Sequence, residues 1–457
     1  MCLRHAAAPD GSNSPGNHDR SAGVVAGSGV MNDPTLYLGR RLSAWSPDDD
    51  LVGLQPEDAR HHTYILGQTG SGKSTLLRNL ALQHLHAGRG FALLDPHGDL
   101  AEEILAQFPS HRADDLVYFN PGDLEFPIGL NLLAQVPRDR RHLVASGIVS
   151  ALKSLWRDSW GPRLEYILLN ALLALLDCQN VSLLGVTRML VDERYREWVV
   201  RQVQDTQVRA FWEQEFASYD PRFLREAIAP VQNKVGQFLL NPPIRNILGQ
   251  TRASVDFRFL MDTGRVFIAN LSKGRLGAEP ANLLGSLLVN QFQLAAMART
   301  DQPEAERRDF HLLVDEFHNY TTDSFATALA EARKYRLCLT LAHQYGAQLG
   351  ETVRDAVFGN VGTMVVFRVG HADAAVFEQE FGGAVAASQF ADLDRFHAHV
   401  RLLESGVTRE PFLIRTLPPM DQRHARRDRL VRRCRERFAS PRAEVERKLK
   451  QWLEGIG

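Results

Sequence analysis

The segment Gly67-Gln-Thr-Gly-Ser-Gly-Lys-Ser-Thr75 carries the clearest chemical signal in this chain. It matches the pattern G-x-x-x-x-G-K-[ST], in which glycines let a tight loop point its backbone N–H groups at phosphate oxygens. In such loops the lysine, here Lys73, supplies charge to the γ-phosphate, and the hydroxyl of Ser74 ligates Mg²⁺. The segment therefore predicts a site for ATP and Mg²⁺ made by Gly67, Gln68, Thr69, Gly70, Ser71, Gly72, Lys73, Ser74 and Thr75.

The residues on either side of this loop predict a strand, a helix and a second strand. Residues 63–66 and 91–94 are short apolar runs typical of buried strands. Between them, apolar residues recur at helical spacing, at Leu76, Leu77, Leu80 and Ala81. A strand, a helix and a strand of these lengths most simply form a right-handed βαβ unit. We therefore expect an α/β P-loop fold with a mainly parallel central sheet.

The remaining sequence divides by texture into five expected parts. Residues 1–33 lack an apolar period and predict a disordered segment, within which Met31 is a candidate true start. Residues 34–136 hold the first part of the α/β core. In residues 137–250 strand-like runs are scarce, and amphipathic stretches at 140–155, 163–176 and 195–216 predict an inserted all-α domain. Strand-like runs return within 251–419, at 265–270, 310–314, 337–342 and 363–369, and a charged helical tail follows at 420–457.

The composition is that of an ordinary soluble protein. Of 457 residues, 44% are apolar and 23% charged, and the formal net charge is -1. The four cysteines lie far apart, which indicates reduced thiols rather than a disulfide or zinc framework. The longest apolar run, residues 166–176, is too short to cross a bilayer, and the first residues lack a secretory h-region. We therefore expect a cytoplasmic protein without an intrinsic membrane span.

An acidic pair at the end of an apolar strand supplies the second part of the predicted site. Asp315 and Glu316 directly follow the run at 310–314. An ATPase needs one carboxylate near Mg²⁺ and a second that orients or deprotonates the attacking water. We expect Asp315 to serve the metal and Glu316 to activate the water.

Three further polar residues have two interpretations each. Gln344 follows the predicted strand 337–342, where it is either a γ-phosphate sensor or an ordinary strand-end amide. Arg333 lies near the end of a predicted helix at 324–334, where most arginines are simply solvated. Asp95 closes the strand 91–94 and precedes a proline, so the residues alone favour a turn over a metal ligand.

The charged tail also has two interpretations. One is a contact with nucleic acid, and the preferred one is a solvated helix whose charge Asp428 and Glu436 partly balance. The arginines concerned are Arg426, Arg427, Arg429, Arg432, Arg433, Arg435 and Arg437.

Taken together, the motifs resemble those of a known family. GQTGSGKST, DPHGD, LLVDEF, EARKYRL, LAHQY and FGNVGTMVVFRVG occur in that order, between residues 36 and 412. The set is similar to that of the HerA/FtsK superfamily of DNA-pumping ATPases, particularly the conjugative type IV secretion coupling proteins and their HerA-like relatives. The resemblance implies a RecA-like motor domain, an inserted helical domain and a homohexameric ring with ATP at subunit interfaces.

The resemblance also implies roles for single residues. Arg333 corresponds to an arginine finger that reaches the γ-phosphate of the neighbouring subunit, and Gln344 corresponds to the sensor. Asp95 corresponds to an acid that helps the metal site, and Arg60 is the nearest match to an arginine that reaches the phosphates. The chain departs from the membrane coupling proteins because it has no N-terminal transmembrane helices.

These features predict an ATP-driven DNA translocase or coupling ATPase that acts in conjugative transfer or DNA processing. The expected partners are DNA, other copies of the chain, and relaxosome, nuclease or type IV secretion components. One alternative is an ATP-dependent scaffold that delivers protein substrates to a secretion apparatus. A P-loop enzyme of another kind, such as a kinase, is disfavoured because no second-substrate motif is found.

Overall fold

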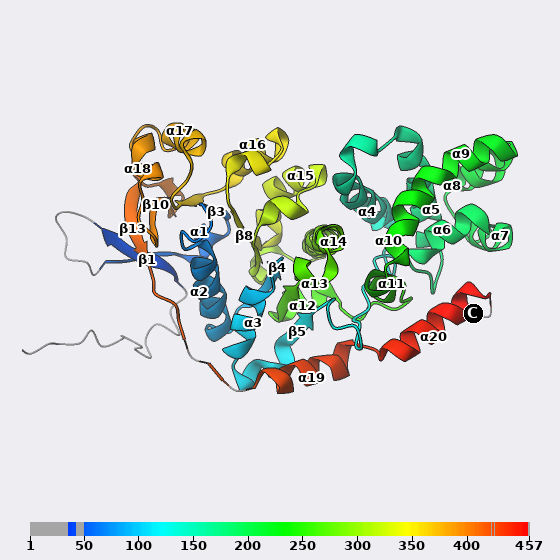
Figure 1. Cartoon of the computed structure of the whole chain (residues 1–457), viewed down its shortest axis with the longest axis horizontal. Helices are drawn as coiled ribbons and strands as arrows, with labels where there is room; N and C mark the ends of the chain where they lie inside the picture. The colour runs from blue at the N-terminus through cyan, green and yellow to red at the C-terminus, as the bar shows by residue number, and fades with distance from the viewer. Residues whose placement is uncertain (1–34, 43–49, 422, 425, 456–457) are drawn as a thin grey trace, which may run out of the picture. The chain divides into compact units, whose positions relative to one another are not determined.

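Eleven strands form one sheet, in the order β2-β1-β13-β10-β9-β3-β8-β7-β4-β6-β5 (Figure 1). The structure is a computed structural model that describes residues 35–42, 50–421, 423–424 and 426–455, so the segment 1–33 lies outside the described residues. The strands of this sheet are β1 Leu36–Leu42, β2 Leu51–Leu54, β3 Thr63–Leu66, β4 Gly90–Asp95, β5 Leu116–Phe119, β6 Val266–Asn270, β7 Phe310–Val314, β8 Leu337–His343, β9 Thr363–Val366, β10 His397–Arg401 and β13 Phe412–Thr416.

The strands from β9 to β5 in this order are parallel. All residues of β3, β4, β5, β7, β8 and β9 are buried, which explains why these strands read as continuous apolar runs rather than alternating patterns. The expected mainly parallel sheet is therefore confirmed. Because these strands are parallel, their last residues meet at one edge, here called the carboxyl edge, and their first residues meet at the opposite amino edge.

The other end of the sheet is antiparallel. There β10 pairs with β9 and β13, and β1 pairs with β13 and β2. The sequence patterns predict none of the strands β1, β2, β10 and β13. These strands are half-buried or interrupted by glycine, arginine and histidine. A small ribbon of β11 Leu403–Glu404 and β12 Val407–Thr408 follows β10.

Helices connect the parallel strands, as right-handed crossovers require. Between the parallel strands they include α2 Lys73–His86, α3 Asp99–Ala106, α12 Phe257–Thr263, α13 Lys273–Leu276, α14 Ala278–Met297, α15 Asp323–Ala332 and α16 Glu351–Asn360. Helix α1 Pro56–Ala59 lies between β2 and β3, and α17 His371–Glu380 and α18 Ala387–Ala391 lie between β9 and the antiparallel β10. Two boundaries differ from expectation. The helix at 324–334 ends at Ala332, so Arg333 begins a 3₁₀ turn. Strand β9 ends at Val366 rather than at residue 369, because the chain turns toward the phosphate loop, where Gln68 N donates to Arg368 O at 2.8 Å.

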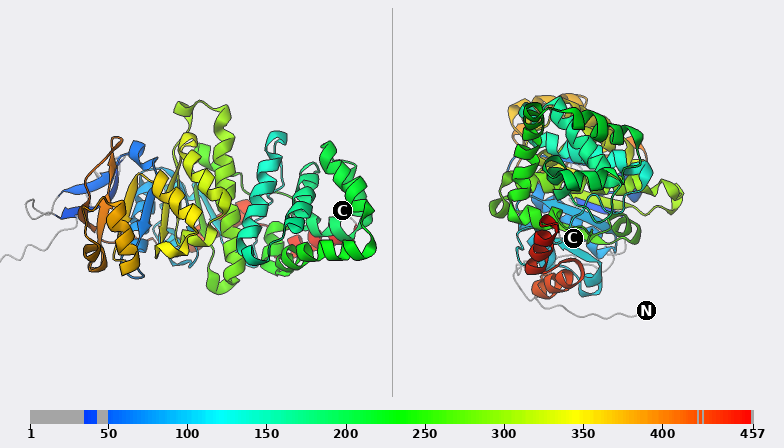
Figure 2. Two further views of the ribbon diagram at one scale, coloured as in Figure 1. Left: turned by 90° about the horizontal axis from the view of Figure 1, so that it is seen from above. Right: turned by 90° about the vertical axis from the view of Figure 1, so that its right-hand side faces the viewer.

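The chain between β5 and β6 is helical and lies beyond the β5 end of the sheet (Figures 1 and 2). Its helices are α4 Arg141–Leu155, α5 Pro162–Leu176, α6 Leu184–Val191, α7 Glu193–Val200, α8 Thr206–Ala210, α9 Pro221–Val231, α10 Gln237–Leu240 and α11 Pro242–Leu248. The amphipathic stretch 195–216 is not one helix. It breaks after α7, because Asp205 caps a new helix by accepting from Gln207 N and Val208 N.

Helix α4 joins this segment to the core by packing against α14 and α15. Gly147 makes the close approach of α4 and α14 feasible, since a Cβ there would lie 2.4 Å from the Asn290 side-chain nitrogen. A larger residue at this position would force the Asn290 side chain to move or the two helices to separate.

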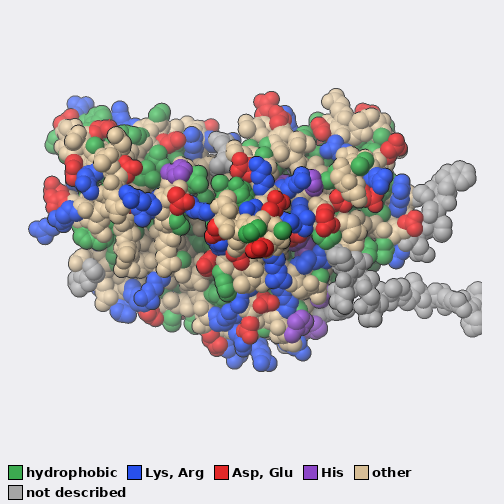
Figure 3. All heavy atoms as spheres, turned by 180° about the vertical axis from the view of Figure 1, so that it is seen from behind, with side chains coloured by type: hydrophobic (Ala, Val, Ile, Leu, Met, Phe, Trp, Pro, Cys, Tyr) green, Lys and Arg blue, Asp and Glu red, His purple; other side chains and the backbone are tan. Residues whose placement is uncertain are grey.

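The charged tail forms α19 Arg427–Phe438 and α20 Arg442–Leu453. Its arginines are not mainly balanced by acids of the tail itself. Arg427 pairs with Glu102, Arg433 with Asp114 and Arg435 with Asp123, all of which belong to the core. Arg427 additionally contacts Asp428. The tail therefore packs on the core through ion pairs, and Figure 3 shows basic and acidic side chains intermingled on the face seen from behind.

Two composition-based expectations can be compared with the described residues. Cys178, Cys338 and Cys434 are free and buried. Within the described ranges, no helix is both long enough and apolar enough to cross a membrane.

Candidate functional site

The predicted site residues gather at the carboxyl edge of the sheet. The phosphate loop follows β3, Asp315 and Glu316 follow β7, Gln344 follows β8, and Asp95 is the last residue of β4. Strand β8 lies between β3 and β7, and β4 is the next neighbour of β7. The order of the strands therefore places all these side chains along one stretch of the edge.

The phosphate loop has the backbone conformation that its glycines allow. Gly70 has φ 78° and Gly72 has φ 126°, values that L side chains rarely adopt. Ser71 is buried and its carbonyl accepts from Phe396 N at 2.8 Å, which ties the loop to the start of β10. Gln68, Thr69, Gly70 and Ser74 are exposed. The outer side of the loop thus stays open while its base is fixed.

Lys73 starts α2 and points back into the loop. Its ammonium donates to Gly67 O at 2.6 Å and to Gln68 O at 3.3 Å, and the side chain is buried. Burial lowers the pKa of Lys73, while the charges of Glu316 and Asp315 act in the opposite direction. The structure therefore brings the loop lysine and the acidic pair together, as the sequence predicts.

Asp315 lies among other acids in a buried position. Burial, followed by the charges of Glu316 and Asp95, raises the pKa of Asp315 to about 7. Asp95 uses both carboxylate oxygens in its own turn, accepting from His97 N and Ala101 N at 2.9 Å each. This is the turn function that the residues alone favour for Asp95. Its charge nonetheless acts on Asp315, so the carboxylates of this edge share one electrostatic environment.

Glu316 and Gln344 are direct partners. The Gln344 side-chain amide donates to Glu316 Oε1 at 2.8 Å. Glu316 has φ 47° and ψ 48°, a left-handed conformation that turns the backbone sharply after β7. The side chain is buried, and its Oε2 atom has no hydrogen-bond partner among the described residues. Gln344, the predicted phosphate sensor, therefore holds Glu316, the carboxylate predicted to activate water.

Arg333 and Arg60 lie at the opposite, amino edge. Arg333 precedes β8, is exposed, and contacts His61 Nδ1 at 3.3 Å. Arg60 precedes β3 and forms a two-point ion pair with Asp309, with Nε–Oδ1 and Nη2–Oδ2 distances of 2.9 Å each. Neither guanidinium reaches the phosphate loop of its own chain. The phosphate contact of Arg60 stays a prediction, and within this chain Asp309 binds its guanidinium.

Two residues beside the acidic pair, Lys273 and Tyr320, are not predicted by the sequence. Lys273 follows β6, donates to Asn319 Oδ1 at 2.6 Å, and has its pKa lowered by burial, with the charge of Glu316 opposing. The hydroxyl of Tyr320 is buried without a partner in the described part of the chain, and burial followed by Asp95, Asp315 and Glu316 raises its pKa. Lys273 could have been predicted from its place in the sequence, because it comes shortly after the end of the parallel strand β6.

The donor set suits Mg²⁺ rather than a protein-only metal site. Within the described ranges, no group of three or more His, Cys, Asp or Glu side chains is arranged to hold a metal. Mg²⁺ commonly takes one or two carboxylates together with water and substrate phosphates, and Asp315 and Ser74 supply oxygens of that kind. The raised pKa of Asp315 and the unpartnered Tyr320 hydroxyl indicate a place where a bound cation and its waters would be favourable.

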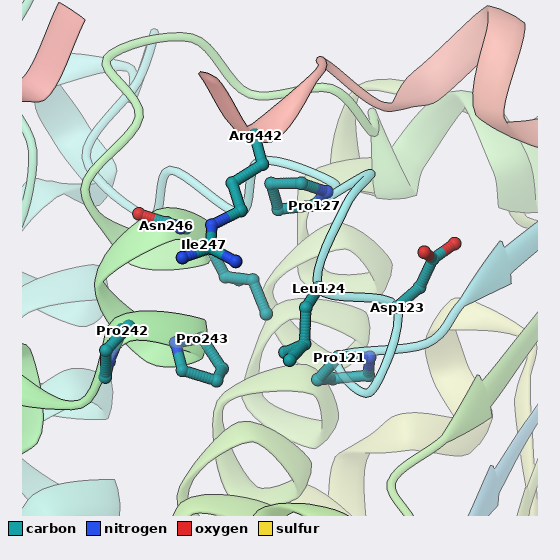
Figure 4. Close-up of a pocket in the computed structure, with 9 residues that line it drawn as sticks. All are labelled: Pro121, Asp123, Leu124, Pro127, Pro242, Pro243, Asn246, Ile247 and Arg442. Atoms are coloured by element: carbon teal, nitrogen blue, oxygen red, sulfur yellow. The ribbon is translucent and has the colours of Figure 1, made fainter. Parts of the chain in front are cut away.

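A hollow of about 200 Å³ lies elsewhere, among the loop after β5, helix α11 and the start of α20 (Figure 4). Figure 4 shows Pro121, Pro127, Pro242, Pro243 and Arg442 around it. It borders none of the residues that the sequence assigns to catalysis. Helix α20 closes one side of it, so it belongs to the packing of the tail.

Comparison with protein families finds a match over residues 47–290 to the family described as helicase HerA, central domain. This range contains the phosphate loop and the helical segment and amounts to more than half of the chain. The chain belongs to the HerA central-domain family. The match ends before Asp315, so the acidic pair and Gln344 rest on the geometry described above.

Several solved structures have the same fold. The bacterial conjugative coupling protein TrwB has a TM-score of 0.59 and 17% identity, covering 82% of this chain and 88% of that one. TrwB with a non-hydrolysable ATP analogue has a TM-score of 0.60 and 16% identity, covering 86% and 96%. VirB4 of Thermoanaerobacter pseudethanolicus has a TM-score of 0.53 and 15% identity, covering 84% and 96%. Comparison with curated protein sequences finds no match.

Proposed function

We propose that this HerA-family chain hydrolyses MgATP at its carboxyl edge and uses the energy to move or deliver DNA. The observation that carries the proposal is the contact between Gln344 and Glu316 beside Asp315 and Lys73. These are the groups that a P-loop ATPase needs to bind phosphates and activate water. TrwB, which has the same fold, has been solved with ADP and Mg²⁺.

Each residue has a proposed step. The backbone N–H groups of residues 67–75 hold the phosphates, and Lys73 leaves its loop carbonyls to neutralise the γ-phosphate. Asp315 and Ser74 would hold Mg²⁺, near which Asp95 adds negative charge, and the bound cation would neutralise phosphate charge. Glu316 accepts the proton of the attacking water, and Gln344 links the position of this base to the state of the γ-phosphate.

We propose that Arg333 completes the site of a neighbouring copy in a homohexameric ring. Arg333 lies at the edge opposite the phosphate loop, so one subunit can offer its carboxyl edge while the next offers its amino edge. A repeated contact of this head-to-tail kind closes into a ring when the rotation per subunit allows it. The exposed guanidinium would then stabilise transition-state charge in the adjacent subunit.

The proposed division of labour follows the sequence. Residues 34–136 and 251–419 form the ATPase core, 137–250 form a helical domain, and 420–457 form a tail that packs on the core through ion pairs. The expected partners beside DNA are relaxosome, nuclease or type IV secretion components. The buried free thiols suit the reducing cytoplasm.

The test is the steady-state ATPase rate with single-stranded DNA, with double-stranded DNA and without DNA, at one fixed salt concentration. Salt is fixed because phosphate contacts weaken steeply as it rises. We expect hydrolysis that DNA stimulates, together with the mass of a hexamer. Hydrolysis indifferent to DNA would contradict the translocase and favour the scaffold that delivers protein substrates. Absence of hydrolysis under all conditions would contradict the ATPase itself.

A further inference from the structure

A second amide beside the site, that of Gln348, has an orientation fixed by the backbone. Gln348 ends the 3₁₀ turn Gly346–Gln348 that follows β8. Its side chain accepts from Gln344 N at 3.2 Å and from Tyr345 N at 3.1 Å. Backbone N–H groups can only donate, so the atom between them must be the amide oxygen. The amide nitrogen then faces the other way, where it lies 3.3 Å from His318 Nε2.

This orientation determines the tautomer of His318. The Gln348 amide nitrogen is only a donor, so His318 Nε2 must accept and carry no proton. Burial lowers the pKa of His318, which favours the neutral ring. The single ring proton of a neutral histidine is then on Nδ1. The tautomer therefore follows from two backbone hydrogen bonds on a different loop.

The protonated nitrogen faces the proposed catalytic base. His318 Nδ1 lies 3.5 Å from Glu316 Oε2. Each of these two buried atoms lacks a hydrogen-bond partner in the described part of the chain. A distance of 3.5 Å is long for a hydrogen bond, but catalytic hydrogen bonds are often long without substrate and shorten in the complex. One contact would thus satisfy both orphaned atoms.

The chain of hydrogen bonds continues on the other side of Gln348. Its amide oxygen lies 3.3 Å from His343 Nδ1, and His343 Nε2 lies 2.6 Å from the Tyr64 hydroxyl. His343 is buried and its pKa is lowered to about 3, mainly by burial, so its ring is also neutral. If Nδ1 of His343 donates, Nε2 accepts from Tyr64, and every donor in the series points toward Glu316.

We propose that His318 is a positioning residue for Glu316 and that Gln348 sets the tautomer in which it acts. The inference rests on the proposed function, in which Glu316 activates water. Gln344 holds one carboxylate oxygen and His318 the other, so the base is fixed from two sides. Because Gln348 also binds the backbone N–H of Gln344, one amide aligns both holders of the base.

Holding Glu316 from both sides would fix the position of its carboxylate relative to the attacking water. A misplacement of about 1 Å can cost on the order of a hundredfold in rate, because reacting groups need near-contact geometry. Among the described residues, the hydrogen bonds and ion pairs of the His318 ring run to Gln348 and Glu316 and not to the phosphate loop. Its loss is therefore expected to lower turnover and leave nucleotide affinity unchanged. A residue that merely stabilised the fold would not separate these two quantities.

The experiment compares kcat and KM for ATP in full-length variants at one pH. In His318→Leu we expect kcat to fall about ten- to a hundredfold, with KM within about twofold of wild type. His318→Asn should recover most of kcat, because its amide N–H can occupy the place of Nδ1–H. Gln348→Met can neither donate to His318 Nε2 nor accept from Gln344 N, so the Nδ1 tautomer is no longer fixed and kcat should fall toward that of His318→Leu. The control is His111→Leu, which changes an exposed histidine before β5 and should have wild-type kcat.

The results separate the two levels of the proposal when Glu316→Gln is measured in parallel. If Glu316→Gln is inactive while His318→Leu keeps wild-type kcat, the positioning role is wrong and the ATPase assignment stands. The same follows if His318→Asn is as slow as His318→Leu. If Glu316→Gln keeps its turnover, the proposed base is wrong and there is nothing for His318 to position.

Discussion

The two edges of the parallel sheet differ in where their candidate catalytic groups find partners. At the carboxyl edge, Lys73, Glu316 and Gln344 are buried or half-buried and hydrogen-bonded within the chain. At the amino edge, Arg60 is bound by Asp309, whereas Arg333 is exposed and contacts only His61 within the described residues.

Under the proposed function, this difference is the reason to expect a second copy of the chain at each site. Phosphate binding, metal binding and water activation can all be assigned to the carboxyl edge of one subunit. Transition-state charge neutralisation by an arginine cannot, because both candidate guanidinium groups lie at the other edge. The site is therefore expected to be complete only where two subunits meet.

The largest expected effect comes from Arg333→Ala. An arginine finger typically contributes about 10³–10⁵-fold to kcat, so turnover should fall by at least the lower part of that range. ATP binding by the variant should change little, since the finger acts mainly in the transition state. The matched control is Arg60→Ala, whose guanidinium is held by Asp309 and which should retain turnover. A large loss in Arg60→Ala with none in Arg333→Ala would exchange the two assignments.

The next effect in size is that of Glu316→Gln. Removal of a general base usually costs about 10²–10⁴-fold, while the amide is close in shape to the carboxylate. We expect wild-type ATP affinity, measured by equilibrium binding, with turnover lost. Turnover within a few-fold of wild type would show that another group activates the water.

A smaller effect is expected for Gln344→Ala, about ten- to a hundredfold in kcat, because it removes one of the two groups that hold Glu316. The comparison of edges is sharpened by the double variant Gln344→Ala/His318→Leu. If both residues act through Glu316, the fold-loss of kcat in the double variant should not exceed the fold-loss in Glu316→Gln. Losses that multiply beyond this limit would point to independent roles.

Much of the carboxyl edge was predictable from sequence because its chemistry is local. The phosphate loop is one contiguous segment, and Asp315 and Glu316 directly follow an apolar strand. The His318–Gln348 contact was not predictable, since it depends on two turns after different strands meeting in space. The partners of Arg60 and of the tail arginines were missed for the same reason, as Asp309, Glu102 and Asp114 are distant in sequence.

The smallest expected effect concerns the stability of the amino edge at acid pH. His62 is buried there, accepting from Leu339 N at 3.1 Å on Nδ1, while Nε2 lies 3.1 Å from Leu329 O. Burial lowers its pKa to about 4. Between pH 6.5 and 4 the unfolded chain binds the proton that the folded chain excludes. The contribution of neutral His62 to the free energy of unfolding is therefore fully present above pH 6.5. Between pH 6.5 and 4 it falls by about 1.4 kcal/mol per pH unit.

The variant His62→Asn isolates this term. Asparagine tolerates the left-handed φ of 64° at this position and does not titrate. We expect thermal or denaturant unfolding to depend less on pH between 7 and 5 in the variant than in the wild type. Identical pH dependence in both proteins would mean that His62 contributes nothing to acid sensitivity.

The most direct test of the two-edge account is to mix Arg333→Ala with Glu316→Gln subunits and measure ATPase activity. Each variant alone lacks one half of every site and should be inactive. In a mixed ring, an Arg333→Ala subunit supplies Glu316 while its Glu316→Gln neighbour supplies Arg333, so roughly a quarter of the interfaces in a random equal mixture become complete. Mixing is expected to restore activity in that proportion. A mixture as inactive as either variant alone, although subunits exchange, would contradict a site shared between the two edges.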